Sequence, residues 1–236
     1  GYPVVAWAHP TTGVDDTCAP SRFGSGMFGS IPGLAEMVQR GFVVVATDYE
    51  GLGVAGVHPY LVGTSAGRSV VDSVRAAAAL TYISATFAVW GHSQGGHAAL
   101  WTGEVAPAYA PELSLAGIAA AAPATLLAEL FEDDLTTLAG KGLTAMTLWS
   151  WSQIYSTPLE TVVLSSALAD VGRIGRSCLA GFADLAIAAG SVLRLNSGDF
   201  LVANPAEKVP WSQFMQQNTP GRAATGIAAP VFIAQG

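Results

Sequence analysis

The chain has 236 residues, enough for one α/β domain with a large core or for such a domain carrying a substantial insertion. It is 51% hydrophobic and 11% charged, and its formal net charge is −7. An acidic chain without a basic stripe repels phosphate backbones, so no nucleic-acid partner is expected. The most apolar window, residues 113–131, contains a proline and several polar residues. We therefore expect a buried strand and a helix there rather than a membrane span.

Short apolar runs alternate with helical patterns through the first 123 residues, as they do in a parallel sheet built from βαβ units. Strands are expected at 3–8, 42–47, 87–90 and 115–121, and helices at 34–40, 67–80 and 95–105. Beyond residue 123 the pattern becomes helical, with segments at 125–138, 143–154 and 159–171, and a strand pattern returns only at 231–234.

This change of pattern predicts three parts. Residues 1–123 form an α/β core, residues 124–226 form a helical cap or lid, and residues 227–236 return to the core sheet. The alternative is a second helical domain with no role in the chemistry. The cap is preferred because ligands of open sheets bind beyond the carboxyl ends of the strands, where such an insertion leaves and returns.

The strongest chemical signal is the hexapeptide Gly91-His92-Ser93-Gln94-Gly95-Gly96, which fits the pattern G-x-S-x-G. It follows an apolar strand pattern and precedes a helix. A sharp strand-to-helix turn of this kind exposes a strained serine as a nucleophile, and the helix N-terminus supports the developing oxyanion. The alternative is an ordinary glycine-rich turn. Ser93 is the predicted nucleophile.

An oxyanion hole needs a second donor, from the loop that follows an earlier strand. The loop after the strand at 3–8 begins His9-Pro10-Thr11-Thr12-Gly13. Thr11 or Thr12 can supply a backbone N–H, and a hydroxyl as well, while Gln94 supplies the other N–H. A plain strand-ending turn is the alternative.

Four histidines are candidates for the base that activates the serine. We expect His9 to hold the oxyanion loop, His92 to pack along the sheet, and His97 to lie on the wrong side of the serine. His58, in a Gly/Pro loop, is the only one expected to move freely. In this arrangement the base follows the serine and the acid along the chain, so the base and the acid are expected beyond residue 236.

The remaining polar residues allow more than one interpretation. Asp48, Tyr49 and Glu50 either line the pocket or position the oxyanion loop, and the acidic run at 132–134 is expected to be a solvated helix face. No His/Cys/Asp spacing suggests a metal site. Cys18 and Cys178 can be free thiols or a pair, depending on the compartment.

The chain resembles the secretory lipase family of α/β-hydrolases, through the segments AWAHPTTGVDDTCAPS, VVVATDYEGLG, HPYLVG, VWGHSQGGHAAL and PVFIAQG. The resemblance implies an α/β-hydrolase fold with a mostly parallel sheet and an inserted helical lid. It also implies hydrolysis of triacylglycerols or other esters, no metal or organic cofactor, and secretion.

The resemblance extends to single residues. Members of the lipase A type have an oxyanion residue six positions before a disulfide-bonded cysteine, which corresponds here to Thr12 and Cys18, although those members have aspartate rather than threonine. Their cysteine pairs with one in the lid, which implies a bond to Cys178. The family's acid follows a strand that ends in a glycine such as Gly236. The strands that precede Pro3 in the family are also expected to be missing, so we expect a fold truncated at both ends.

These observations together predict a secreted carboxylic-ester hydrolase that forms an acyl-enzyme on Ser93. Its partner is a small ester or lipid substrate, with transient contact to a lipid interface. A peptidase or acyltransferase on the same fold, or a non-catalytic binding module, remain the alternatives.

Overall fold

The structure is a computed structural model that describes residues 1–24, 26–179, 182–196, 200–222 and 226–235. Gly236, named above as the end of a strand, lies outside these residues. Within the described residues, five parallel strands form one sheet in the order β2-β1-β3-β4-β5. Their bounds are β1 (Tyr2–Ala8), β2 (Val43–Ala46), β3 (Ile83–His92), β4 (Ser114–Ala121) and β5 (Val231–Ala234).

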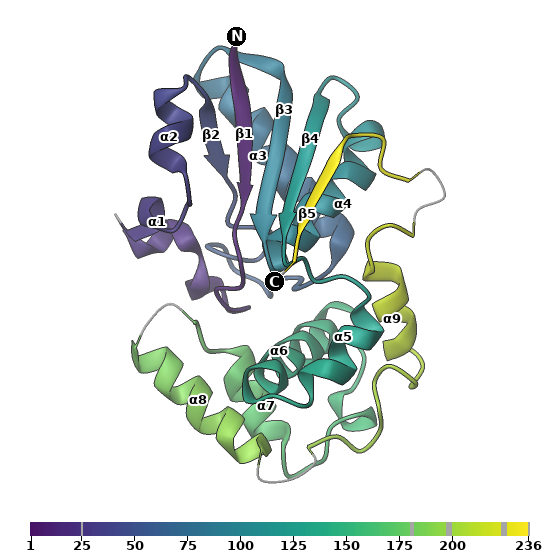
Figure 1. The fold of residues 1–236 in the computed structure, drawn as a ribbon. Coiled ribbons are helices and arrows are strands. Elements are labelled where there is room, and N and C mark those ends of the chain that lie inside the picture. The colour runs from purple at the N-terminus through teal and green to yellow at the C-terminus, as the bar shows by residue number, and fades with distance from the viewer. Residues whose placement is uncertain (25, 180–181, 197–199, 223–225, 236) are drawn as a thin grey trace.

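Two long helices cover one face of this sheet: α3 (Gly63–Leu80) and α4 (Gln94–Tyr109) (Figure 1). The helix α3 buries Val70, Val71 and Val74, which lie on one stripe of the helix because 3.6 residues make a turn. They pack against strand residues such as Val4 and Val89. The other face of the sheet looks toward the viewer in Figure 1, where the short helix α2 (Leu34–Gln39) packs beside the edge strand β2.

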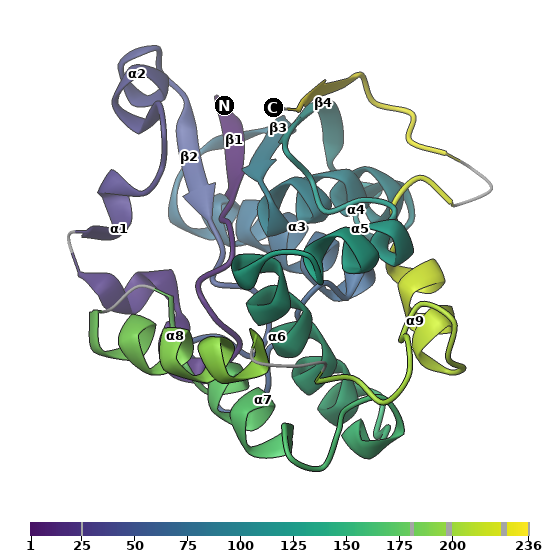
Figure 2. The ribbon, with the colours of Figure 1, turned by 60° about the horizontal axis from the view of Figure 1, so that its bottom comes forward.

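The chain between β4 and β5 forms a helical insertion, which we define as residues 124–226. It contains α5 (Leu127–Asp134), α6 (Leu138–Ile154), η3 (Leu159–Thr161), α7 (Leu168–Gly175), α8 (Phe182–Asn196) and α9 (Trp211–Asn218). The insertion lies beyond the carboxyl ends of the strands (Figures 1 and 2). It has its own apolar core around Leu127, Trp151, Trp211 and Met215.

All three predicted helices of the insertion have different bounds in the structure, and the one at 143–154 begins earlier, because α6 starts at Leu138. The segment at 125–138 breaks after α5, because Thr137 is the N-cap of α6 and its side chain accepts a hydrogen bond from Gly140 N–H. The segment at 159–171 is not one helix: it starts with the 3-10 turn η3, and α7 begins only at Leu168. The remaining short helices lie between β1 and β2: η1 (Asp16–Cys18), η2 (Pro20–Phe23), α1 (Gly26–Gly29) and α2 (Leu34–Gln39).

Candidate active site

Ser93 occupies a strained turn between the last residue of β3 and the first residue of α4. Its backbone has φ 57° and ψ −118°, a conformation that non-glycine residues adopt only when the surrounding structure holds them there. Ser93 N–H donates to Ala121 O of the neighbouring strand (2.9 Å), which anchors the turn to β4. The geometry is that of a nucleophile elbow.

Close backbone approach explains why glycine stands on either side of this turn. A Cβ at Gly91 would collide with the backbone carbonyl of Gly95, and a Cβ at Gly95 would collide with Ala8 O of β1. Helix α4 can therefore begin directly against the strand ends only with glycine at these two positions. The predicted strand-turn-helix context of the motif is confirmed.

The N-terminus of α4 supplies polar hydrogen atoms next to Ser93. Gln94 is the first residue of the helix, and the first N–H groups of an α-helix have no acceptor within that helix. The helix dipole adds positive charge at the same end. An oxyanion that forms beside Ser93 would be stabilised by these N–H groups and by the helix dipole.

The Gln94 side chain is fixed by His58, which is buried with 1% of its surface exposed. His58 Nδ1 lies 2.8 Å from Glu50 O, and a carbonyl only accepts, so Nδ1 carries the proton. Burial lowers the pKa of His58 to about 3, so the ring is neutral and Nε2 is an acceptor. Gln94 Nε2 donates to it across 2.7 Å. The expectation that His58 moves freely is wrong.

The structure also shows where the other three histidines lie. His9 Nδ1–H donates to Pro10 O (2.7 Å) at the start of the oxyanion loop, which confirms the predicted role of His9. His97 is buried and bonds Asn218 O through Nε2 (2.8 Å). His92 is exposed, so the packing role predicted for it is wrong, because the end of β3 leaves its side chain in solvent. Among the described residues, no histidine is hydrogen-bonded to the Ser93 side chain.

The turn after β2 supports the oxyanion loop rather than lining the cavity at Ser93. Tyr49 Oη donates to His9 O (3.0 Å), and its ring lies against the His9 ring with 4.3 Å between centroids. Asp48 accepts hydrogen bonds from both the backbone N–H and the hydroxyl of Ser21. Of the two interpretations of residues 48–50, the positioning role fits these contacts.

The insertion holds the oxyanion loop from the other side. Cys18 and Cys178 form a disulfide with 5.2 Å between their Cα atoms, which confirms the implied pairing. Thr12 O accepts a hydrogen bond from Leu179 N–H (2.8 Å), one residue after that disulfide. Thr12 Oγ1 is buried and, among the described residues, has no hydrogen-bond partner. Its hydroxyl hydrogen is therefore not committed to another group.

A cavity of about 140 Å³ lies beside Ser93. Polar members of its lining are Ser93, Gln94, Tyr60, Thr147, Asp134 and Gln235; apolar ones include Leu61, Pro123, Leu130, Phe131 and Leu143. The cavity thus joins the elbow, the loop around Tyr60 and the helices α5 and α6. Thr12 is not among its lining residues. No group of three or more potential metal ligands occurs in the described parts of the chain.

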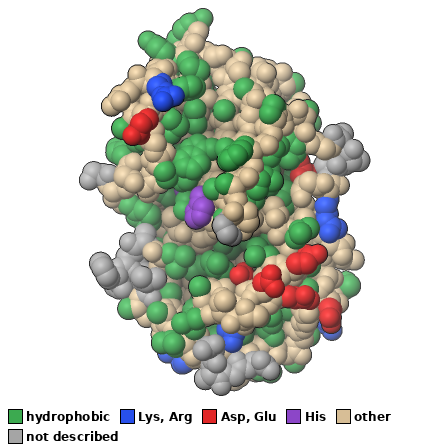
Figure 3. Space-filling view, in the orientation of Figure 1, with side chains coloured by type: hydrophobic (Ala, Val, Ile, Leu, Met, Phe, Trp, Pro, Cys, Tyr) green, Lys and Arg blue, Asp and Glu red, His purple; other side chains and the backbone are tan. Residues whose placement is uncertain are grey.

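The acidic run of α5 is only partly solvated. Glu132 and Asp133 are exposed as expected, but Asp134 is half-buried and lines the cavity beside Ser93. The expectation fails for this residue because each helical step turns by about 100° and carries the third carboxylate toward the cavity. Burial, and then the charge of Asp133, raise the pKa of Asp134. Figure 3 shows acidic side chains gathered on the insertion.

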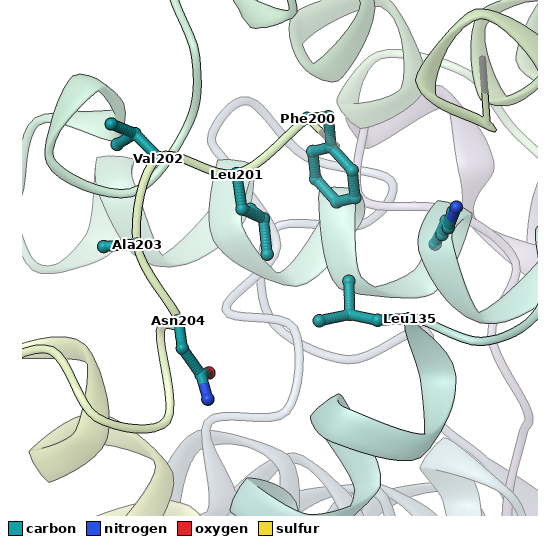
Figure 4. A pocket seen from close by; sticks show the side chains of 7 residues that line it. Leu135, Phe200, Leu201, Val202, Ala203 and Asn204 are labelled. Carbon is teal, nitrogen blue, oxygen red and sulfur yellow. The ribbon is translucent and has the colours of Figure 1, made fainter. Parts of the chain in front are cut away.

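The insertion contains further cavities. One of about 480 Å³ is apolar and lies between α6, α7 and α8, with Leu143 shared between it and the cavity at Ser93. Another, of about 390 Å³, is shown in Figure 4. Phe200, Leu201 and Leu135 line its apolar side, and Asn204 lies at its far end. Its lining does not include Ser93.

The sequence matches the secretory lipase family over residues 31–181, more than half of the chain. The chain belongs to the secretory lipase family. Among its relatives, Lipase 9 of Candida albicans is 38% identical over 93 residues, which are 36% of this chain and 20% of that protein. Lipase A of Moesziomyces aphidis is 33% identical over 82 residues, covering 34% and 17%. The matched segments thus span about a fifth of these relatives' length.

Solved structures support the α/β-hydrolase fold of this secretory lipase family member. The rice cell wall degrading esterase LipA from Xanthomonas oryzae superposes with a TM-score of 0.79 at 24% identity, covering 99% of this chain and 66% of that one. Candida antarctica lipase A gives 0.74 at 19% identity, covering 99% and 57%. The family is secretory, and a disulfide persists in oxidising compartments, so the protein is a secreted one. No described helix is long and apolar enough to cross a membrane.

Proposed function

We propose that this protein is a carboxylic-ester hydrolase for lipid-like esters, with Ser93 as the nucleophile. The observation that carries the proposal is the Ser93 backbone, which is held at φ 57° between a strand and a helix N-terminus. Membership of the secretory lipase family supports the same reaction class. In this reaction Ser93 Oγ attacks the acyl carbonyl, and the alcohol leaves as an acyl-enzyme forms.

The proposed oxyanion hole combines the backbone N–H of Gln94 with that of Thr12. The Gln94 N–H belongs to the first turn of α4, so it lacks an intrahelical acceptor. The loop that carries Thr12 is tied down by the disulfide and by the bond from Leu179. Donors that are fixed before reaction stabilise a developing oxyanion without reorganisation.

The proton is moved by a histidine and an acid that we place outside residues 1–236. Three of the four histidines present are buried and hydrogen-bonded away from Ser93, and burial lowers the pKa of His58 and His97 to about 3 and 4. A base for catalysis near neutral pH needs a pKa close to that pH. These residues are therefore unsuited to the task.

We further propose that the helical insertion acts as a cap that binds the acyl chain. The apolar cavity between α6, α7 and α8 has about 480 Å³ and shares Leu143 with the cavity at Ser93. An acyl chain attached to Ser93 could pass Leu143 and gain hydrophobic stabilisation there.

The experiment is an assay of the full-length secreted protein with p-nitrophenyl esters and with aminoacyl-anilides, followed by labelling with a fluorophosphonate. We expect ester turnover, little anilide turnover, and labelling that Ser93→Ala removes. Labelling that persists in Ser93→Ala would show that another residue is the nucleophile. Faster turnover of anilides than of esters would instead favour a peptidase.

A further inference from the structure

The cavity beside Ser93 contains one carboxylate, that of Asp134, which the described residues leave without a hydrogen-bond donor. Asp134 lines it, and among the described residues no group donates a hydrogen bond to its carboxylate or forms an ion pair with it. Gln94 lines the same cavity, but its side-chain oxygen Oε1 is buried away from it, and Nε2 faces the acceptor nitrogen of His58.

Two of the hydroxyl groups around this cavity already have partners. Tyr60 Oη is hydrogen-bonded to Thr11 Oγ1 (2.8 Å). Thr147 Oγ1 donates to Leu143 O, one turn earlier in α6 (2.9 Å). The Ser93 hydroxyl, the Gln94 N–H and the Gln235 amide can donate elsewhere in the cavity, but none of them is bonded to Asp134, so a ligand group that complements this carboxylate must donate a hydrogen bond.

Asp134 is held in this position by its backbone. It is the last residue of α5, and its carbonyl accepts a hydrogen bond from Thr137 N–H (3.1 Å). Gly140 packs so tightly against the Asp134 backbone that a Cβ there would collide with it. The carboxylate also stands at the negative end of the α5 dipole and beside Asp133, so a donor from a ligand is the stabilisation available to it.

The size of the cavity limits the ligand group. At about 140 Å³ it has the liquid volume of roughly four or five water molecules, which suits a group of a few heavy atoms. The larger apolar cavity beyond Leu143 is the place for an acyl chain. The polar cavity is thus available to the alcohol part of an ester.

We infer that Asp134 is a specificity residue that selects esters whose alcohol is a small polyol the size of glycerol with free hydroxyl groups. This inference rests on the proposed esterase function and adds the nature of the alcohol to it. The free hydroxyls donate to the Asp134 carboxylate while the ester carbonyl lies at Ser93.

The test compares two butyrate esters of three-carbon alcohols, glyceryl monobutyrate and propyl butyrate, with the full-length protein. They differ only in the two free hydroxyls. We expect kcat/KM to favour glyceryl monobutyrate by about tenfold, because hydrogen bonds to a charged group are among the stronger ones. Asp134→Leu should abolish this ratio and Asp134→Asn should reduce it, mainly through KM. Asp133→Asn removes the same charge one residue away, outside the cavity, and should leave the ratio unchanged.

Each outcome has a distinct meaning. A ratio near one in the wild type, or a ratio that Asp134→Leu leaves intact, would overturn the inference while the esterase proposal stands. Loss of the ratio in Asp133→Asn as well would overturn it too, because a general field would then be responsible. The alcohol part of butyrylcholine carries a cation and no hydroxyl. If the wild type prefers butyrylcholine to both esters and Asp134→Asn removes that preference, Asp134 selects by charge and the inference is wrong. Only the absence of turnover on every ester would refute the proposed function itself.

Discussion

The replacement of His58 by glutamine should make the protein less sensitive to acid. His58 is buried, donates through Nδ1 to Glu50 O and accepts from Gln94, so the folded state holds it neutral. Burial lowers its pKa to about 3 from an ordinary value of 6.5. In the unfolded chain the same ring takes up a proton below pH 6.5.

The sign and size of the effect follow from this difference. Because the folded-state pKa is depressed, the unfolded state binds more protons between pH 6.5 and about 3, and stability falls as the pH falls through that window. The slope is about 1.4 kcal/mol per pH unit for one proton, and the full effect is at most about 5 kcal/mol. His97, whose pKa is lowered to about 4, adds the same slope down to that pH. Since domains are stable by about 5–15 kcal/mol, acid unfolding near pH 4 is expected.

The assay is urea unfolding of the full-length protein at half-unit steps from pH 7 to pH 4. His58→Gln should lower stability at pH 7, because Glu50 O loses its donor, and should reduce the acid slope by one proton. His58→Asn, which can still donate to Glu50 O, is a second variant in case the first folds poorly. His92→Gln replaces an exposed histidine and should keep the wild-type slope. Equal slopes for the wild type and both His58 variants would refute the reasoning.

Three further predictions concern Ser93, Thr12 and the disulfide. Ser93→Ala should reduce ester turnover to the residual supplied by the oxyanion hole, on the order of 10³–10⁴ over water, and near-normal initial rates would contradict the nucleophile assignment. Thr12→Val should lower kcat less than Ser93→Ala does, since its backbone donor survives; a loss as large would mean that the hydroxyl is the essential donor. Replacing Cys18 and Cys178 together by alanine opens a cross-link with a sequence separation of 160 residues. It should destabilise by up to about 5 kcal/mol in denaturant titrations, and an unchanged midpoint would exclude a stabilising role.

The nucleophile elbow could be predicted because its determinants are local. The strand pattern, the glycines that permit close backbone approach and the following helix all lie within about twenty residues, and the structure has the same elements at those places. The parallel sheet followed from the alternation of apolar runs in the same way. Such features depend on periodicity and backbone sterics, which the sequence carries directly.

The roles of His58 and Asp134 could not be predicted, because they depend on contacts between distant segments. His58 stands among glycine and proline, which indicate a loop, yet Gly51 packs against its backbone and Gln94 lies 36 residues away. Asp134 follows two exposed carboxylates, and only the position of α5 over the strand ends turns it toward Ser93. The spacing of residues along the sequence predicts neither the burial of His58 nor the orientation of Asp134.

The oxyanion loop connects the sheet to the helical insertion, which favours a functional cap over an independent second domain. Thr11 bonds Tyr60, and Tyr60 is in turn held by α6, since its N–H donates to Ser150 Oγ (3.0 Å) and its carbonyl accepts from Trp151 Nε1 (2.8 Å). Thr12 is tied to the segment after α7 by the bond from Leu179. A shift of the insertion would therefore move the loop that we propose as an oxyanion donor.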